Sequence, residues 1–151
     1  KANHTKVKVI QTESRPAYEG REEAKAIAGL GFEVRLITDS AAGLLMPEVD
    51  YVVSGADRIG KNYFVNKTGT YANALLCREY QIPFFVLADS RKVTSTQFHP
   101  ADMPNPGKPP EEVWKTEHPN ISAINMYFEA IPCQLVNAFI TEQGRLLPSE
   151  L

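Results

Sequence analysis

Long hydrophobic runs are missing from this sequence. The longest apolar runs, such as residues 82–88, are far too short to span a bilayer. The first residues do not follow the order of charged, apolar and small residues that defines a signal peptide. We therefore expect a cytoplasmic protein without a membrane partner.

Cysteine and histidine are scarce, and positive charge is not in excess. The two cysteines, Cys77 and Cys133, lie far apart on apolar segments, which favours buried free thiols over a disulfide or a metal site. The three histidines show no metal-ligand spacing, and we expect neither a metal nor another cofactor. A formal net charge of −2 provides no field that would hold nucleic acid nonspecifically, so we expect no DNA partner, although a local basic cluster remains compatible with this charge.

The residues that are present suit one ordinary hydrophobic core. Of the 151 residues, 43% are hydrophobic and 23% charged, which predicts a single domain over residues 1–151. Strand and helix patterns alternate along the chain, and this alternation favours a mostly parallel sheet flanked by helices. The predicted strands cover residues 7–10, 32–37, 51–53, 82–88, 121–125 and 138–141. The predicted helices cover residues 18–30, 38–46, 68–80 and 132–136.

Residues 94–119 interrupt this alternation. They contain six of the eleven prolines and show little periodicity, which predicts a long loop with at most one helical turn, at residues 111–114. We expect Trp114 to pin this loop to the body of the domain.

Carboxylates follow the predicted strands. Because the carboxyl ends of parallel strands meet at one edge of a sheet, these side chains would gather there. They are Glu13, Asp39, Asp57, Asp89 and Glu142. Asp39 and Asp89 each precede a serine, and this position favours capping of a following helix. Asp57 lies instead in a longer turn.

The layout around Asp57 suits a chemical site. Gly55 lets the backbone turn at the end of a buried strand, which leaves Asp57 at the rim of the sheet. A carboxylic acid shielded by apolar strands can donate a proton near neutrality, whereas nearby cations favour its ionised form. Asn66 and Lys67 follow in the predicted loop that enters a helix at about Thr68, where backbone N–H groups attract anions. The alternative is that Asp57 caps its own turn and Lys67 is a solvated surface residue.

Six motifs occur in an order that is typical of one family. They are Thr12-Glu13-Ser14-Arg15-Pro16, Glu19-Gly20-Arg21, Ile37-Thr38-Asp39-Ser40-Ala41, Gly55-Ala56-Asp57-Arg58-Ile59, Asn66-Lys67 with Gly69-Thr70, and Phe128-Glu129 with Ile131-Pro132. Over nearly its whole length the chain resembles the carboxyl-terminal domain of the initiation factor 2B alpha/beta/delta family, which includes methylthioribose-1-phosphate isomerase and ribose-1,5-bisphosphate isomerase. The resemblance implies an α/β, three-layer Rossmann-like fold with a mostly parallel sheet.

The resemblance also implies roles for individual residues. Asp57 matches the acid that assists conversion of an aldose 1-phosphate into a ketose. Asn66 and Lys67 match a pair that contacts the substrate, and Gly55 belongs to the motif of Asp57. Glu19 falls where the methylthioribose enzymes carry a substrate-contacting glutamine, so its carboxylate argues against that particular substrate. We therefore predict Asp57 as the catalytic residue and the other four as substrate-binding residues.

One departure from the family concerns cysteine. The isomerases place a catalytic cysteine at the end of a strand that precedes the segments seen here, and neither Cys77 nor Cys133 matches it. The family's helical amino-terminal domain has no counterpart in this sequence. We therefore expect a fragment of a longer protein, which lacks the family's first strand and its amino-terminal segment and is inactive alone.

Two functions from different classes follow from the resemblance. The first is a sugar-phosphate isomerase, an intramolecular oxidoreductase that acts on a phosphorylated sugar. The second is a noncatalytic regulatory or assembly subunit related to translation initiation factor 2B, which binds protein or a nucleotide-derived small molecule. Either function implies a homo-oligomer or association with a related subunit.

Overall fold

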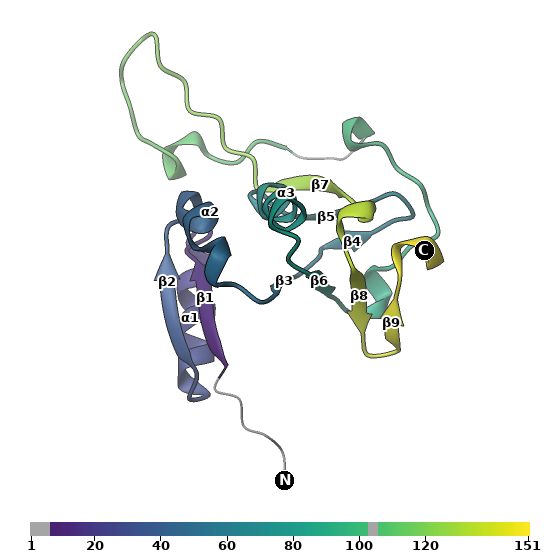
Figure 1. The fold of residues 1–151 in the computed structure, drawn as a ribbon. Coiled ribbons are helices and arrows are strands. Elements are labelled where there is room, and N and C mark those ends of the chain that lie inside the picture. Colours follow the sequence, from purple (N-terminus) through teal and green to yellow (C-terminus); the bar gives the residue numbers. More distant parts are fainter. Residues whose placement is uncertain (1–6, 103–105) are drawn as a thin grey trace. The chain divides into compact units, whose positions relative to one another are not determined.

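The computed structural model describes residues 7–102 and 106–151 of the chain. The chain is made of two compact units, residues 1–42 and 43–151, and Figure 1 traces the elements of each. Among the described residues, no helix is both long enough and apolar enough to cross a membrane.

The first unit contains two parallel strands joined by a helix. β1 (Lys8–Thr12) pairs along its whole length with β2 (Glu33–Ile37). α1 (Glu19–Gly29) connects them, with acidic residues in its first turn. Gly31 follows the helix with a φ of 91°, a left-handed conformation that glycine adopts easily. The predicted stop of this helix at Gly31 is confirmed.

The second unit contains a four-stranded sheet in the order β3-β6-β8-β9. The first three strands are parallel, and β9 forms an antiparallel hairpin with β8. The strands are β3 (Val52–Ser54), β6 (Phe84–Leu87), β8 (Ala138–Thr141) and β9 (Gly144–Leu146). This sheet contains the predicted strands at residues 51–53, 82–88 and 138–141, and the predicted α/β class is confirmed.

A second, antiparallel sheet in the order β4-β5-β7 belongs to the same unit. Its strands are β4 (Arg58–Ile59), β5 (Tyr63–Lys67) and β7 (Phe128–Pro132). β4 and β5 form a hairpin that lies between β3 and α3 (Thr70–Tyr80) along the chain. The sequence analysis did not predict this hairpin, and its prediction of a simple loop between residue 53 and the helix is wrong.

Aromatic side chains join the two sheets of the second unit. Phe64 of β5, Phe84 of β6 and Phe139 of β8 are fully buried. The Phe64 ring lies edge-on to Phe139 with centroids 5.7 Å apart, an arrangement that adds to the benefit of burial. Cys77 and Cys133 are buried and free, as predicted, and burial raises the pKa of these thiols to about 11 and about 12.

Several sequence predictions for residues 94–132 need correction. Residues 121–125 do not form a strand; the strand of this region is β7, which begins at Phe128. Trp114 is 57% exposed, so it does not pin the loop. A 3-10 turn at Pro110–Glu112 stands close to the predicted helical turn. Residues 103–105 of the predicted loop lie outside the described residues.

Candidate functional site

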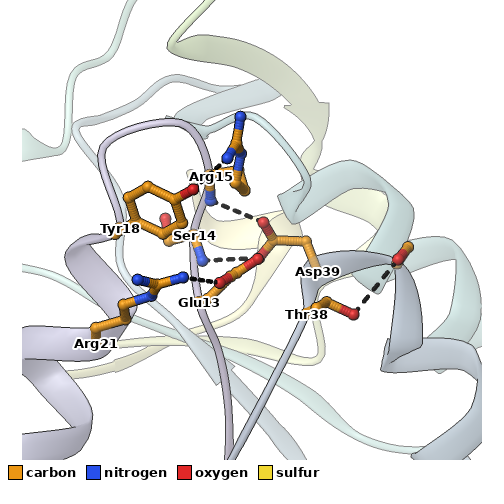
Figure 2. Close-up of polar contacts among 8 residues, drawn as sticks. Glu13, Ser14, Arg15, Tyr18, Arg21, Thr38 and Asp39 are labelled. Carbon is orange, nitrogen blue, oxygen red and sulfur yellow. Dashed lines mark hydrogen bonds and ion pairs between the residues drawn. The ribbon is translucent and has the colours of Figure 1, made fainter. Parts of the chain in front are cut away.

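In the first unit, the side chain of Asp39, which follows β2, binds the backbone that follows β1. Its carboxylate oxygens accept hydrogen bonds from the backbone amides of Ser14 at 2.8 Å and Arg15 at 2.7 Å (Figure 2). Thr38, not Asp39, occupies the N-cap position of the helical turn that follows, and it makes no side-chain cap. The prediction that Asp39 caps this helix is therefore wrong, and its charge fixes the loop after β1.

Two arginines contact Tyr18 just beyond this loop. The guanidinium carbon of Arg21 lies 3.7 Å from the centroid of the Tyr18 ring, and that of Arg15 lies 5.0 Å away. Arg15 also donates a hydrogen bond to the Tyr18 hydroxyl (Figure 2). Arg21 Nη2 lies 2.6 Å from Glu13 Oε2, and this hydrogen bond raises the pKa of Arg21. Glu13 thus positions an arginine through a charge-assisted hydrogen bond.

Glu19, one of the predicted binding residues, is the first residue of α1 and is exposed. Its neighbour Gly20 packs against β1 so closely that an added Cβ would lie 1.9 Å from the Thr12 carbonyl oxygen. The helix can begin at this place only because residue 20 is glycine. Glu19 belongs to the first unit, whereas the other four predicted site residues belong to the second.

Asp57 lies beyond the carboxyl end of β3, where the sequence predicts it. Its side chain is exposed, and its amide donates to the Val65 carbonyl at 2.8 Å. Val65 is also paired with Arg58. Two consecutive residues, Asp57 and Arg58, therefore face the single residue Val65, and this pattern is a β-bulge, which changes the direction of the side chains. An added Cβ on Gly55 would lie 3.8 Å from Asn66 Oδ1. The β4–β5 hairpin therefore brings Asn66 close to Gly55 and Asp57, beyond the carboxyl end of β3.

Asn66 and Lys67 end β5 and do not lie in a loop, which corrects the sequence prediction. Neighbouring residues of a strand point to opposite faces of the sheet, so the two side chains diverge. Asn66 Nδ2 donates to Thr70 Oγ1 at 2.9 Å at the start of α3. Lys67 Nζ lies 4.1 Å from the centroid of the Tyr127 ring.

Lys67 therefore belongs to a cluster that joins the long loop to β5. The Tyr127 hydroxyl donates to Glu112 Oε2 at 2.6 Å, and Asn125 Nδ2 donates to the same oxygen at 2.9 Å. These two hydrogen bonds, helped by the charges of Lys108 and Lys67, lower the pKa of Glu112. Asn125 is only 4% exposed, so this loop is anchored by a buried amide.

The start of α3 is already occupied by a carboxylate of the chain. Glu129 Oε1, on β7, accepts hydrogen bonds from the amides of Gly69 and Tyr71, each at 2.8 Å. This carboxylate uses the N–H groups and the dipole of the helix start in the way a bound anion would. The expectation that these amides meet a ligand anion is therefore wrong for Gly69 and Tyr71.

Two further carboxylates at strand ends are structural. Asp89 caps the turn after β6 by accepting the Arg91 amide at 2.9 Å, which confirms the prediction for Asp89. The side chain of Arg91 also binds it and, together with this amide, lowers the pKa of Asp89 to about 2. Glu142, after β8, accepts the Ser90 amide at 3.0 Å, and hydrogen bonding from Ser90 lowers the pKa of Glu142. Neither carboxylate is held as a proton donor.

Sequence reasoning missed Lys92 as a candidate. Its ammonium nitrogen lies 2.5 Å from the carbonyl oxygen of Ala56, the residue before Asp57. The two residues are 36 positions apart, so no local spacing could have paired them. The available signal was the polar run Asp89-Ser90-Arg91-Lys92 after β6. Among the described residues, no group of three or more His, Cys, Asp or Glu side chains could hold a metal ion.

Several known proteins are similar to this chain in sequence and in structure. A model of the initiation factor 2 subunit family matches residues 1–148. A Pyrococcus horikoshii protein, named provisionally as a translation initiation factor eIF-2B subunit 2-like protein, is 38% identical over 98% of this chain and 51% of its own length. The ribose 1,5-bisphosphate isomerase of Methanocaldococcus jannaschii is 36% identical over 94% of this chain and 47% of its own length.

The crystal structure of 5-methylthioribose 1-phosphate isomerase from Pyrococcus horikoshii is also similar. It superimposes with a TM-score of 0.87 at 33% identity, over 95% of this chain and 43% of the other. The chain thus spans about half the length of the curated proteins that it matches.

Proposed function

Because the chain belongs to the initiation factor 2 subunit family, we propose that it forms the acid-bearing part of a sugar-phosphate isomerase. The reaction would convert an aldose 1-phosphate into a ketose. Proteins named as isomerases of ribose 1,5-bisphosphate and of methylthioribose 1-phosphate are among its relatives. The activity of the whole protein is part of this proposal, since the chain covers about half of each relative.

The observation that carries the proposal is the position of Asp57. Its exposed carboxyl stands past the carboxyl end of β3, at the same end of the hairpin as Gly55 and Asn66. Asp39, Asp89 and Glu142 follow other parallel strands, and all three are engaged by backbone amides. Asp57 has no such side-chain bond among the described residues, so it is the strand-end carboxylate best suited to act on a ligand.

Each predicted residue then takes a role in ring opening. A sugar with a C1 phosphate is locked as an acetal, and opening its ring requires a proton on the ring oxygen. Asp57 would supply that proton, while Asn66 would contact the sugar through its amide. Lys67 would contact another part of the substrate. The role of Glu19 stays the prediction that the family resemblance implies. Catalysis by residues 1–151 alone is not expected, because Cys77 and Cys133 are buried thiols with raised pKa values.

A noncatalytic regulatory subunit is the second candidate. The occupied start of α3 favours it, because Glu129 already fills a position where a phosphorylated ligand could bind. The similarity to a protein named as a translation initiation factor subunit points the same way. In that function Asp57 would serve partner binding or stability, and a nucleotide-derived molecule or a related subunit would be the ligand.

An assay of the full-length protein separates the two candidates. Asp57→Asn keeps the shape of the side chain and removes its acidic proton, so turnover of ribose 1,5-bisphosphate should fall by at least about 100-fold with little change in affinity. Methylthioribose 1-phosphate should be the poorer substrate, because Glu19 stands where the methylthioribose enzymes carry a glutamine, whose neutral amide can donate a hydrogen bond. A wild-type protein that is inert toward both sugars but binds a partner subunit would rule out the isomerase proposal.

A further inference from the structure

The side chain of Asn66 is held by Thr70, the first residue of α3. Asn66 Nδ2 donates to Thr70 Oγ1 at 2.9 Å, and Thr70 Oγ1 itself donates to the Lys67 carbonyl oxygen at 2.7 Å. Thr70 is only 7% exposed, so water competes little for these two bonds. Thr70 therefore ties the side chain of Asn66 to the backbone of Lys67.

The two bonds of Thr70 decide which way the Asn66 amide points. A hydroxyl group has one hydrogen, and Thr70 uses it on a carbonyl oxygen, which can only accept. Thr70 Oγ1 must therefore accept from Asn66, and only the NH2 end of the amide can donate to it. The two ends of an amide have nearly the same shape, so this bond is what distinguishes them. The carbonyl oxygen of Asn66 must point away from Thr70.

The Asn66 carbonyl oxygen lies beside Gly55 instead. A Cβ added to Gly55 would lie 3.8 Å from Asn66 Oδ1, and it would meet no other described atom within 4 Å apart from those of its chain neighbours. No hydrogen bond to Asn66 Oδ1 is formed among the described residues. Asp57 follows Gly55 by two residues. The oxygen is therefore available as an acceptor for a ligand that approaches Asp57.

The backbone around Thr70 is fixed from the neighbouring strand β7. Glu129 Oε1 accepts hydrogen bonds from the amides of Gly69 and Tyr71, which stand on either side of Thr70. Glu129 is also the residue of β7 that pairs with Asn66 of β5. These contacts order the Asn66 amide before a ligand arrives, which removes part of the entropic cost of binding.

We propose that Thr70 is a positioning residue that makes Asn66 accept a hydrogen bond from a hydroxyl of the sugar that reacts at Asp57. This inference rests on the proposed function. An amide oxygen can only accept, so a sugar hydroxyl can donate to it, whereas an ionised phosphate oxygen has no hydrogen to give. Thr70 thereby directs a ring hydroxyl of the substrate, and not a phosphate group, toward the oxygen of Asn66.

Titration of the full-length protein with ribose 1,5-bisphosphate tests the role of Thr70. Thr70→Val keeps the shape of the side chain but removes its hydroxyl, so it should raise the Kd about fivefold. Thr70→Ser keeps the hydroxyl and should hold the Kd within about twofold of wild type. Thr68→Val is the matched control, because Thr68 Oγ1 also donates to a backbone carbonyl, that of Met126 at 2.7 Å, and it should leave the Kd unchanged. An equal loss in Thr68→Val and Thr70→Val would overturn the proposal.

The 2-deoxy and 3-deoxy analogues of this ligand separate positioning from a structural role. The ring form of ribose 1,5-bisphosphate has free hydroxyls only at C2 and C3, so one analogue lacks the group that Asn66 accepts. That analogue should bind wild type about fivefold more weakly than the complete ligand, and Thr70→Val should not weaken its binding further. A general loss of the turn would weaken the binding of both analogues as much as that of the complete ligand.

Three results of these titrations would overturn the proposal. They are an unchanged Kd in Thr70→Val, an equal weakening of all three ligands by Thr70→Val, and equal affinity of wild type for all three ligands. The last comparison needs no variant, so it decides the question even if Thr70→Val does not fold.

Failure of this inference is distinguishable from failure of the proposed function. If turnover depends on Asp57 while Thr70→Val binds like wild type, only the role of Thr70 is wrong. If the wild type turns over neither sugar but the loss of the Thr70 hydroxyl and the loss of a sugar hydroxyl are coupled, the isomerase function is wrong and the positioning role stands. A wild-type protein that binds no sugar phosphate contradicts both.

Discussion

The structural roles of several charged side chains depend on hydrogen-bond partners that lie far away in the sequence. Asp39 and Asp89 look alike as helix caps, yet Asp39 binds amides 24 and 25 residues earlier while Asp89 caps its own turn. Glu129 caps α3 from 60 residues away. The residue types and their placement at strand ends were predictable. The partners were not, because contacts between distant segments leave no local pattern.

Glu112 provides a pH-dependent test at the residue scale. Hydrogen bonds from Tyr127 and Asn125 lower its pKa in the folded state below the unfolded value. Its contribution to stability is therefore present above the unfolded pKa and is lost as the pH falls through the folded pKa. Glu112→Gln should lower the thermal midpoint at pH 7, and its difference from wild type should shrink toward pH 3.

Thermal unfolding followed by circular dichroism between pH 3 and pH 7 would measure this difference. Glu111→Gln is the matched control, because Glu111 is the exposed neighbour of Glu112. The control should leave the pH dependence of the midpoint unchanged. A constant difference between Glu112→Gln and wild type across this range would show that ionisation of Glu112 does not stabilise the loop.

At the scale of elements, the sequence predicted those strands whose own residues form a short apolar run. The runs that became β3, β6 and β8 are apolar and short, and each fits a buried parallel strand. β7 ends in Pro132, a residue that argues against a strand, and its pairing with β5 spans more than 60 residues. β5 was missed because Asn66 and Lys67 suggested a loop, although Tyr63 to Val65 favour a strand.

The two glycines of α1 should respond in opposite ways to alanine. A Cβ at Gly20 would meet the Thr12 carbonyl oxygen at 1.9 Å, so Gly20→Ala must displace the helix or the strand. We expect it to lower the free energy of unfolding by about 2 kcal/mol or more. Gly29 has no neighbour within 4 Å of such a Cβ, and Gly29→Ala should stabilise by about 0.5–1 kcal/mol.

Urea denaturation of both variants measures these free energies. The same substitution in the same helix makes the comparison independent of the general preference of alanine for helices. A Gly20→Ala variant as stable as Gly29→Ala would contradict the close packing of α1 on β1. The contact with Thr12 would then not explain why glycine occupies the second position of the motif Glu19-Gly20-Arg21.

At the scale of the molecule, the chain consists of two compact units. The prediction of a single domain over residues 1–151 stays a prediction. Of the predicted site residues, Gly55, Asp57 and Asn66 lie close together beyond the carboxyl end of β3. Lys67 follows Asn66 on β5, with its ammonium group over the Tyr127 ring. The positions of Gly55 and Asp57 were predictable, because both follow the predicted strand at residues 51–53. The separation of Asn66 from Lys67 was not, because it depends on the unpredicted strand β5.

Association with a second copy or a related subunit is the remaining expectation at this scale. Residues 121–151 are rich in apolar side chains, and several of those in the loop before β7 are exposed, including Ile121, Ile124 and Met126. Exposed apolar groups that gather on one segment are typical of an interaction surface. A specific dimer would bury about 800 Å² on each partner, and this loop would supply part of that area.

Light scattering at increasing protein concentration should therefore reveal a dimer. Ile124 is 79% exposed, and Ile124→Lys would place a charge in the interface, so we expect the dimer to dissociate at least about tenfold more readily. Leu30 is 76% exposed in the first unit, and Leu30→Lys is the matched control that should leave association unchanged. Because both side chains are exposed in the single chain, neither substitution should change the thermal midpoint of an isolated monomer. A wild-type protein that remains monomeric at high concentration would contradict association, whereas a dimer indifferent to Ile124→Lys would contradict only the choice of surface.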